Sequence, residues 1–185
     1  MTARWNRPRT SGQDVARIVG VSDSEPRQEE APAVPPRFAR HLEGAAHRRR
    51  GGERPWVAVA RVDGIDEIRD HWGDPAAEEF LRSVASALRG SLRESDKLSP
   101  VGRAEYGIIL DAPSADDVIA GLNRLVSEVA DLAEQDHRWS GGSLFVGVTQ
   151  LESPDAGATL GRAREALRHG ERRGGARVTM AEASA

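Results

Sequence analysis

Hydrophobic residues recur along this chain with two spacings, and their alternation predicts alternating strands and helices. Continuous apolar runs, such as residues 56–60, are typical of strands covered on both faces of a sheet. Apolar residues at three- and four-residue steps, as from Ala77 to Leu92, are typical of helices that bury one face. The expected helices are 37–50, 65–68, 77–92, 118–132 and 160–168, and the expected strands are 56–60, 98–101, 107–110, 143–149 and 176–178. This order predicts an α/β fold with helices around one mostly antiparallel sheet.

Residues at the ends of these elements fit their expected places. The first helix ends at the arginines of 48–50, followed by two glycines, the usual placement of positive charge and glycine at a helix C-terminus. Ser114 stands where it can cap the helix that follows it. Residues 102–106 are expected to form the turn of a hairpin. We therefore expect residues 35–181 to fold as one domain, with a short C-terminal tail at 182–185.

The first 34 residues differ in composition from the rest. They are rich in Arg, Pro, Ser and Glu, which bury little surface, so we expect residues 1–34 to form a disordered tail. Residues 14–22 look like the opening of a helix-turn-helix, but Pro26 stands where the DNA-reading helix would have to run. A short transient helix is the simpler interpretation.

Composition excludes several classes of function. The 185 residues carry a formal net charge of -3, and the sequence pI is about 6.0, which argues against a general nucleic-acid binder. Cysteine is absent, so disulfides and thiolate metal sites are excluded. No apolar run reaches the roughly 18 residues that suggest a membrane helix. We expect a soluble, cytoplasmic protein with neither a nucleic-acid partner nor a membrane insertion.

Several short segments resemble the GGDEF family of bacterial diguanylate cyclases. Residues 63–73 are similar to the family's Asp-x-Asp-x-Phe-Lys-x-Ile-Asn-Asp-x-aromatic-Gly segment, entered one strand residue earlier at Arg61. Phe145-Val146-Gly147-Val148 is similar to Ser-Ile-Gly-Val, and residues 163–167 resemble Ala-Asp-x-Ala-Leu. Gly102-Arg103-Ala104-Glu105-Tyr106 takes the place of the signature hairpin. The resemblance implies the palm-like fold of nucleotidyl cyclases, with a mostly antiparallel central sheet flanked by helices.

The same resemblance implies that the catalytic positions are degenerate. In the family, two carboxylates hold the divalent metal that joins two GTP molecules, and their counterparts here are Arg61 and Ala104, which cannot bind Mg²⁺. The remaining replaced positions are Arg69 and Glu78 for the guanine-reading Asn and Asp, and Glu171 and Gly175 for the phosphate-binding Lys and Arg. Glu105 remains within the degenerate hairpin. We therefore expect no enzyme activity, no metal and no cofactor.

In contrast to the catalytic positions, the residues of the family's inhibitory site are present in this sequence. Its Arg-x-x-Asp motif is present as Arg93 and Asp96, and its third contact, an Arg on the helix after the hairpin, corresponds to Arg124. The resemblance implies that these residues bind cyclic di-GMP. A guanidinium matches the O6 and N7 acceptors of guanine and pairs with phosphate, while a carboxylate accepts from guanine N–H groups.

A simpler alternative exists for two of these residues. Arg93 and Asp96 lie three positions apart near a helix end, where a solvated salt bridge contributes only about 0.2 to 0.5 kcal/mol. In a chain with 30% charged residues such pairs are common.

Two functional hypotheses remain from the sequence. In the first, a non-catalytic GGDEF domain senses cyclic di-GMP and relays its occupancy to a protein partner, through its N-terminal tail or by forming a homodimer. In the second, the domain is a ligand-independent interaction module whose tail or remodelled hairpin at Arg103 and Ala104 docks a protein partner. Titration with cyclic di-GMP distinguishes them.

Overall fold

The computed structural model describes residues 34–47, 54–173 and 175–182. The expected N-terminal tail, its helix-turn-helix lookalike, the expected helix end at 48–52 and nearly all of the C-terminal tail lie outside the described residues. Among the helices in the described ranges, none has the length and apolar character needed to cross a membrane.

Helices and strands alternate as the hydrophobic spacing predicts. The helices are α1 (Pro36–His47), α2 (Ile65–Trp72), α3 (Asp74–Ser91), α4 (Ala115–Gln135) and α5 (Ala156–Arg172), with a short 3-10 turn, η2 (His137–Trp139). The strands are β1 (Trp56–Asp63), β2 (Lys97–Pro100), β3 (Glu105–Leu110), β4 (Ser143–Gln150) and β5 (Val178–Met180). Ser114 caps α4 as expected, because its side chain accepts a hydrogen bond from the Asp117 N–H at 3.2 Å.

The five strands form one sheet in the order β2-β3-β1-β4-β5. β1 lies at the centre and pairs antiparallel with β3 and β4. β2 pairs antiparallel with β3, whereas β5 pairs parallel with β4 at the other edge. The sheet is therefore mostly antiparallel, which confirms the fold expected from the sequence.

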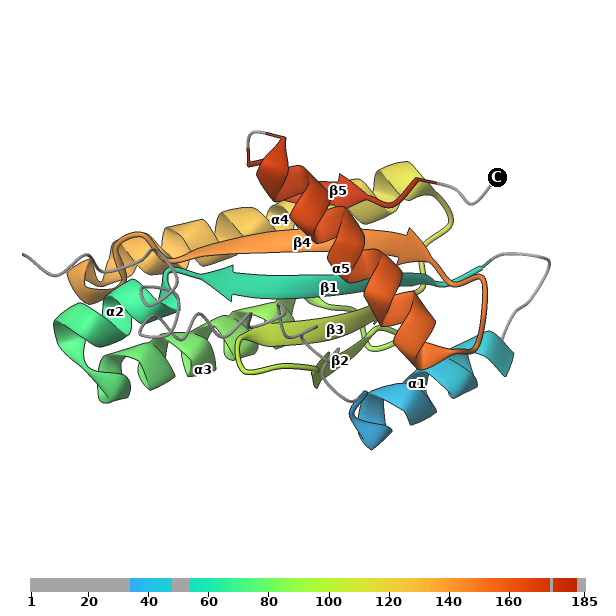
Figure 1. Ribbon diagram of the computed structural model, residues 1–185, viewed down its shortest axis with the longest axis horizontal. Coiled ribbons are helices and arrows are strands. Elements are labelled where there is room, and N and C mark those ends of the chain that lie inside the picture. Colours follow the sequence, from blue (N-terminus) through green and yellow to red (C-terminus); the bar gives the residue numbers. More distant parts are fainter. Residues whose placement is uncertain (1–33, 48–53, 174, 183–185) are drawn as a thin grey trace, which may run out of the picture. The chain divides into compact units, whose positions relative to one another are not determined.

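Helices cover both faces of this sheet (Figure 1). Val57 and Val59 of the central strand belong to the cluster under α1 and α5, while Ala58 and Ala60 belong to the cluster under α3 and α4. All four side chains are completely buried. Because successive strand residues point to opposite faces, an uninterrupted apolar run is what a strand between two helical layers requires.

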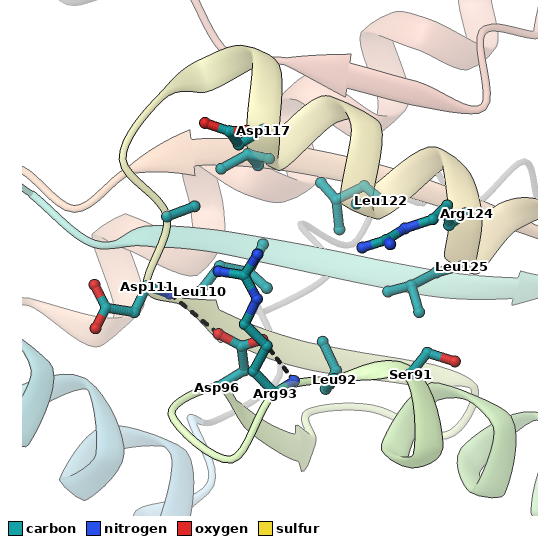
Figure 2. Close-up of a pocket in the computed structure, with 13 residues that line it drawn as sticks. Ser91, Leu92, Arg93, Asp96, Leu110, Asp111, Asp117, Leu122, Arg124 and Leu125 are labelled. Atoms are coloured by element: carbon teal, nitrogen blue, oxygen red, sulfur yellow. Dashed lines mark hydrogen bonds between the residues drawn. The ribbon is translucent and has the colours of Figure 1, made fainter.

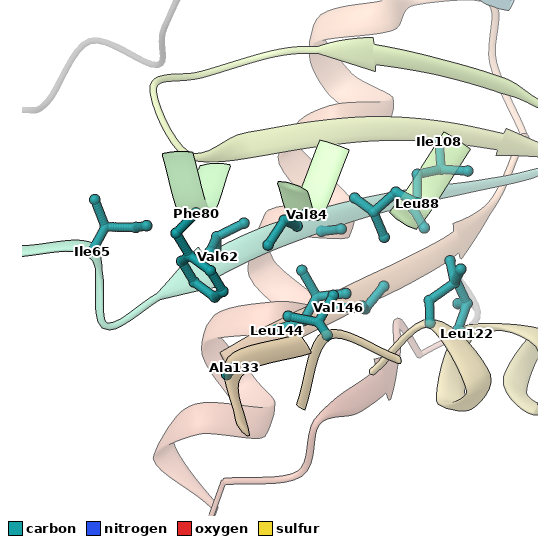
Figure 3. Close-up of a cluster of buried hydrophobic side chains, with 14 of the residues drawn as sticks. Val62, Ile65, Phe80, Val84, Leu88, Ile108, Leu122, Ala133, Leu144 and Val146 are labelled. Carbon is teal, nitrogen blue, oxygen red and sulfur yellow. The ribbon is translucent and has the colours of Figure 1, made fainter. Parts of the chain in front are cut away.

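The larger cluster lies between the sheet and α3 and α4 (Figure 3). Phe80, Val84 and Leu88 recur every four residues along α3, and none of the three is exposed to solvent. Full burial of one such side chain contributes about 1.5 to 3 kcal/mol to the free energy of unfolding. This row of contacts fixes α3 on the sheet, and with it the loop that follows α3.

Some element bounds differ from those the sequence predicts. β3 begins at Glu105 rather than at residue 107, because Glu105 and Tyr106 continue the ladder opposite Arg61 and Ala60 of β1. α5 begins four residues earlier than expected, where the Asp155 carboxylate accepts hydrogen bonds from the N–H groups of residues 157 and 158. The last strand is shifted by two residues, to Val178–Met180.

Candidate functional site

A small pocket opens where the loop after α3 meets the end of β3 and the first half of α4. Its volume is about 50 Å³, and Leu92, Leu110, Val118 and Leu122 supply apolar parts of its wall. The three residues expected at an inhibitory site all line it: Arg93, Asp96 and Arg124. The fold thus brings together side chains that are up to 31 positions apart in the sequence.

Asp96 fastens this loop to the sheet. Its carboxylate accepts one hydrogen bond from the Arg93 N–H at 3.0 Å and one from the Asp111 N–H at 3.2 Å. Its own N–H donates to the Arg93 carbonyl at 3.0 Å. Because an ionised carboxylate has about four lone-pair positions, it can still accept from a ligand. The sequence predicts a ligand contact for Asp96 but gives no sign of this structural role.

The two arginines of the pocket keep their guanidinium groups unpaired among the described residues. No ion pair joins Arg93 to Asp96, so the surface salt bridge expected from the simpler alternative is not formed. Figure 2 shows Arg93 and Arg124 extending from the loop and from α4 into the same space. It also shows the carboxylates of Asp111 and Asp117 turned away from that space. Two guanidinium donors and one carboxylate acceptor therefore remain available to a ligand.

This arrangement suits a flat, polar ligand held at one edge. A volume of about 50 Å³ holds only a few atoms, so a larger ligand would insert an edge and leave its remainder in solvent. Leucine side chains supply an apolar surface, while the guanidinium forks pair with planar acceptors or phosphate oxygens. A purine edge attached to a phosphate has both features.

The hairpin lies on a different part of the domain. Between β2 and β3 the chain turns through residues 101–104, and the turn is closed by a 2.9 Å hydrogen bond from the Val101 N–H to the Glu105 carbonyl. The Ala104 carbonyl accepts from the Val62 N–H at 2.9 Å, while its methyl group packs against the cluster under α3 and α4. Ala104 therefore has a packing role and offers no side-chain ligand to a metal.

An ion pair joins two of the positions expected to be degenerate. The Arg61 guanidinium at the end of β1 contacts the Glu171 carboxylate near the end of α5. Their side chains are 33% and 25% exposed, so water only partly screens the pair. The cation of Arg61 is thus neutralised by α5 and does not stand free at the hairpin.

A second ion pair holds the hairpin itself. Arg164 of α5 donates to the Glu105 carboxylate at 3.0 and 2.9 Å and to the Val101 carbonyl at 3.2 Å. The two side chains are 11% and 21% exposed. Sequence reasoning did not single out Arg164, although the signal was present: a base replaces the acid of the Ala-Asp-x-Ala-Leu segment. Glu105 is therefore engaged within the protein.

The two ion pairs are neighbours because of strand register. Arg61 lies directly opposite Glu105 of β3 and opposite Phe145 of β4, so all three point to the face that α5 covers. The Arg177 guanidinium lies 4.3 Å from the centroid of the Phe145 ring, a cation–π contact at the same end of the sheet. Arginine and glutamate side chains therefore lie next to one another at this end of the sheet, under α5.

The other positions expected to be degenerate either form ion pairs within the protein or are exposed on its surface. Arg69 on α2 pairs with Asp66 and with Asp74, the latter at 3.0 Å. The Glu78 side chain lies on the exposed surface of α3, and Gly175 follows α5 with a φ of 79°. In the described part of the chain, no three His, Cys, Asp or Glu side chains gather closely enough to hold a metal ion.

Reversing the Arg61–Glu171 pair tests its contribution to stability. We expect Arg61→Glu to lower the free energy of unfolding by about 1 kcal/mol, because it sets a carboxylate against Glu171 and Glu105. The double variant Arg61→Glu/Glu171→Arg restores opposite charges and should recover part of that loss. Urea denaturation of the two single variants and the double variant measures the coupling free energy. Strictly additive effects would show that the contact contributes nothing.

Comparison with known proteins identifies the family of this chain. The family model for the diguanylate cyclase GGDEF domain matches residues 36–177. Diguanylate cyclase DosC of Escherichia coli is 31% identical over 154 residues, which cover 82% of this chain and 33% of that relative. DgcP of Pseudomonas aeruginosa is 31% identical over 141 residues, covering 74% of this chain and 21% of the relative. The chain thus spans a third or less of these curated relatives.

Solved structures agree with the sequence comparison. The GGDEF domain of DgcB from Caulobacter crescentus, in complex with c-di-GMP, superposes with a TM-score of 0.68 at 25% identity, covering 79% of this chain and 89% of that one. Diguanylate cyclase SiaD from Pseudomonas aeruginosa, in complex with its activator SiaC, gives 0.69 at 25% identity, covering 83% and 61%. With its sheet order, its hairpin and these matches, the chain belongs to the GGDEF domain family.

Proposed function

We propose that this domain is a non-catalytic receptor for cyclic di-GMP that relays ligand binding to a protein partner. The observation that carries the proposal is the pocket at which Arg93 and Arg124, without ion-pair partners among the described residues, lie beside the carboxylate of Asp96. Guanine offers acceptors to the arginines and N–H donors to the carboxylate, and the phosphodiester offers oxygens to either guanidinium. The related DgcB domain, solved in complex with c-di-GMP, supports the choice of ligand.

The proposed lack of catalysis follows from the hairpin region. A divalent cation requires oxygen ligands, yet the two expected metal positions carry a guanidinium at Arg61 and a methyl group at Ala104. The neighbouring carboxylates of Glu105 and Glu171 already pair with arginines. The residues present therefore do not fit the metal that the family's chemistry needs, and no catalytic step is assigned to them.

The positions expected to bind GTP also oppose the nucleotide. Glu171 stands where the resemblance implies a phosphate-binding lysine, and Arg69 is held by two carboxylates. A carboxylate beside a triphosphate raises its free energy by like-charge repulsion. GTP is thus proposed to lack binding residues at its expected substrate positions, among the residues that the structure describes.

The partner is proposed to be a protein, reached through the N-terminal tail or through a second copy of the domain. The related SiaD structure, solved with its activator SiaC, shows that a cyclase of this family can form a complex with a separate protein. In the alternative, the domain binds its protein partner without cyclic di-GMP and acts only as an interaction module.

Calorimetric titration of the purified protein tests the receptor proposal. Cyclic di-GMP should bind saturably at micromolar concentrations and more tightly than GTP. Absence of heat with cyclic di-GMP would contradict the receptor role and leave the interaction module as the remaining function. The dissociation constant of cyclic di-GMP should rise with salt concentration, because part of the interaction is between phosphate and guanidinium.

Cyclase activity should be absent. With Arg61 and Ala104 at the metal positions, incubation with GTP and Mg²⁺ or Mn²⁺ is expected to give no cyclic dinucleotide by chromatography. The variant Ala104→Asp should remain inactive, because Arg61 and Glu171 would still oppose metal and triphosphate. Product formed by the wild type and lost on Glu105→Ala would overturn the proposed lack of catalysis.

A further inference from the structure

A second pocket lies on the other side of the Arg93 loop. Its volume is about 330 Å³, within the range of small-ligand sites, and it lies between α1, the end of α3 and the start of β2. It shares Leu92, Arg93 and Asp96 with the pocket described above. The loop from 92 to 96 thus forms a wall of both pockets.

Positive charge dominates this second pocket. Arg37 of α1, Arg89 of α3, Arg93 and Lys97 line it, against the carboxylates of Glu94 and Asp96. Among the described residues, no ion pair engages any of the three arginines.

The two carboxylates of the pocket, Glu94 and Asp96, are outnumbered by its four cationic groups. The Asp96 carboxylate already accepts two backbone N–H groups. Lys97 donates from Nζ to the Glu94 carbonyl at 2.7 Å, which holds the ammonium at the pocket and leaves it two further donors. Within the part of the chain that the structure describes, the pocket therefore presents several cationic donors without an ion-pair partner to a ligand.

The helix ends beside the pocket have opposite effects on an anion. Arg37 belongs to the first turn of α1, which has no acidic residue, so the positive end of that helix dipole favours an anion. α3 ends at Ser91, and its negative end disfavours one by a similar amount. The side-chain charges consequently decide the preference of the pocket, and they favour phosphate, whose oxygens match the guanidinium fork.

We infer that Arg37 and Arg89, with the shared Arg93, form a phosphate-binding subsite between α1 and α3. The subsite stands on its own residues, whereas its link to cyclic di-GMP rests on the proposed function. Because Arg93 lines both pockets, a ligand bound between Arg93 and Arg124 in the first pocket can extend a phosphate toward the second. Occupancy would thereby connect the ligand to α1, the first helix of the described domain.

Titration with inorganic pyrophosphate tests the subsite without any nucleotide. Wild-type protein should bind it, and Arg37→Ala or Arg89→Ala should each raise the dissociation constant by about tenfold, the loss of one charge-assisted hydrogen bond. Arg82→Ala is the matched control, because Arg82 is an exposed arginine of α3 that lies two helical turns from Arg89 and outside the pocket. Its dissociation constant should change by less than about twofold. Circular dichroism checks that each variant is folded.

The same variants titrated with cyclic di-GMP separate the two proposals. Weaker binding by Arg37→Ala and Arg89→Ala, with Arg82→Ala unchanged, would support a shared ligand. If wild type binds pyrophosphate through Arg37 and Arg89 but does not bind cyclic di-GMP, the subsite stands and the receptor proposal fails. Equal pyrophosphate binding by wild type, Arg37→Ala and Arg89→Ala would overturn the subsite, whatever the dinucleotide does.

Discussion

Replacing Arg93 by alanine is expected to weaken binding of cyclic di-GMP by about a hundredfold, or about 3 kcal/mol. Arg93 lines both pockets of the loop, and its guanidinium has no ion-pair partner among the described residues, so it can give its donors to guanine or phosphate. Removal of the side chain loses two charge-assisted hydrogen bonds and the positive charge that offsets the phosphates. Calorimetry under identical salt conditions measures the difference.

Two further variants make this result specific. Arg93→Lys keeps the charge but not the planar fork, so it should recover less than a tenth of the lost affinity. Arg173→Ala removes an equal charge from an exposed position after α5, away from both pockets, and should bind like wild type. Equal affinity of wild type and Arg93→Ala would exclude the pocket as the binding site.

Arg93 can be replaced with less damage to the loop than Asp96. The hydrogen bond from residue 93 to Asp96 comes from its backbone N–H, which alanine retains. Asp96→Ala would instead remove the acceptor that joins the loop to Asp111 at the end of β3. An affinity loss in that variant would mix loop disorder with a missing ligand contact, so Arg93 provides the cleaner test.

The hydrophobic spacing predicts most of the fold because each element buries a face of its own. The apolar residues of β1 and the four-residue steps of α3 need only local geometry to be recognised, and both elements are confirmed. Element ends are less predictable, because they depend on a partner. The sequence predicts that Glu105 belongs to a turn, whereas in the structure it is a strand residue that pairs with Arg61 of β1.

Only those site residues that belong to a recognisable family motif could be predicted from the sequence. Arg93 and Asp96 lie on the loop after α3 and Arg124 lies on α4, and the resemblance predicts that the three share one site. The pairing of Arg164 with Glu105 depends on where α5 crosses the sheet, 59 positions later in the chain. No local pattern predicts such a contact. Likewise, no local pattern predicts that the Asp96 carboxylate accepts from backbone N–H groups, or that Arg93 has no ion-pair partner among the described residues.

α5 can pack closely across the sheet because one residue of β4, Gly147, has no side chain. Substitution of this glycine should have a large effect on stability. Gly147 lies under α5, where an added Cβ would stand 2.0 Å from the Ala163 carbonyl oxygen and 2.5 Å from the Leu167 nitrogen. These are backbone atoms, so no side chain can rotate to make room. The clash can be relieved only if α5 moves away from the sheet.

We therefore expect Gly147→Ala to lower the free energy of unfolding by about 3 kcal/mol or more, the upper end of the cost of overpacking a core. Such a loss is a large part of the roughly 5 to 15 kcal/mol that stabilises a domain. Displacement of α5 would also separate Arg164 from Glu105 and Glu171 from Arg61. Urea denaturation followed by circular dichroism measures the change.

Gly161→Ala is the matched control on the covering helix. Gly161 lies within α5, is exposed, and has no atom within 4 Å of an added Cβ. Alanine has a higher helix propensity than glycine, so this variant should be more stable than wild type by about 0.5 to 1 kcal/mol. The two Gly→Ala changes thus have opposite expected signs. A Gly147→Ala protein as stable as wild type would show that α5 does not lie this close to β4 in solution.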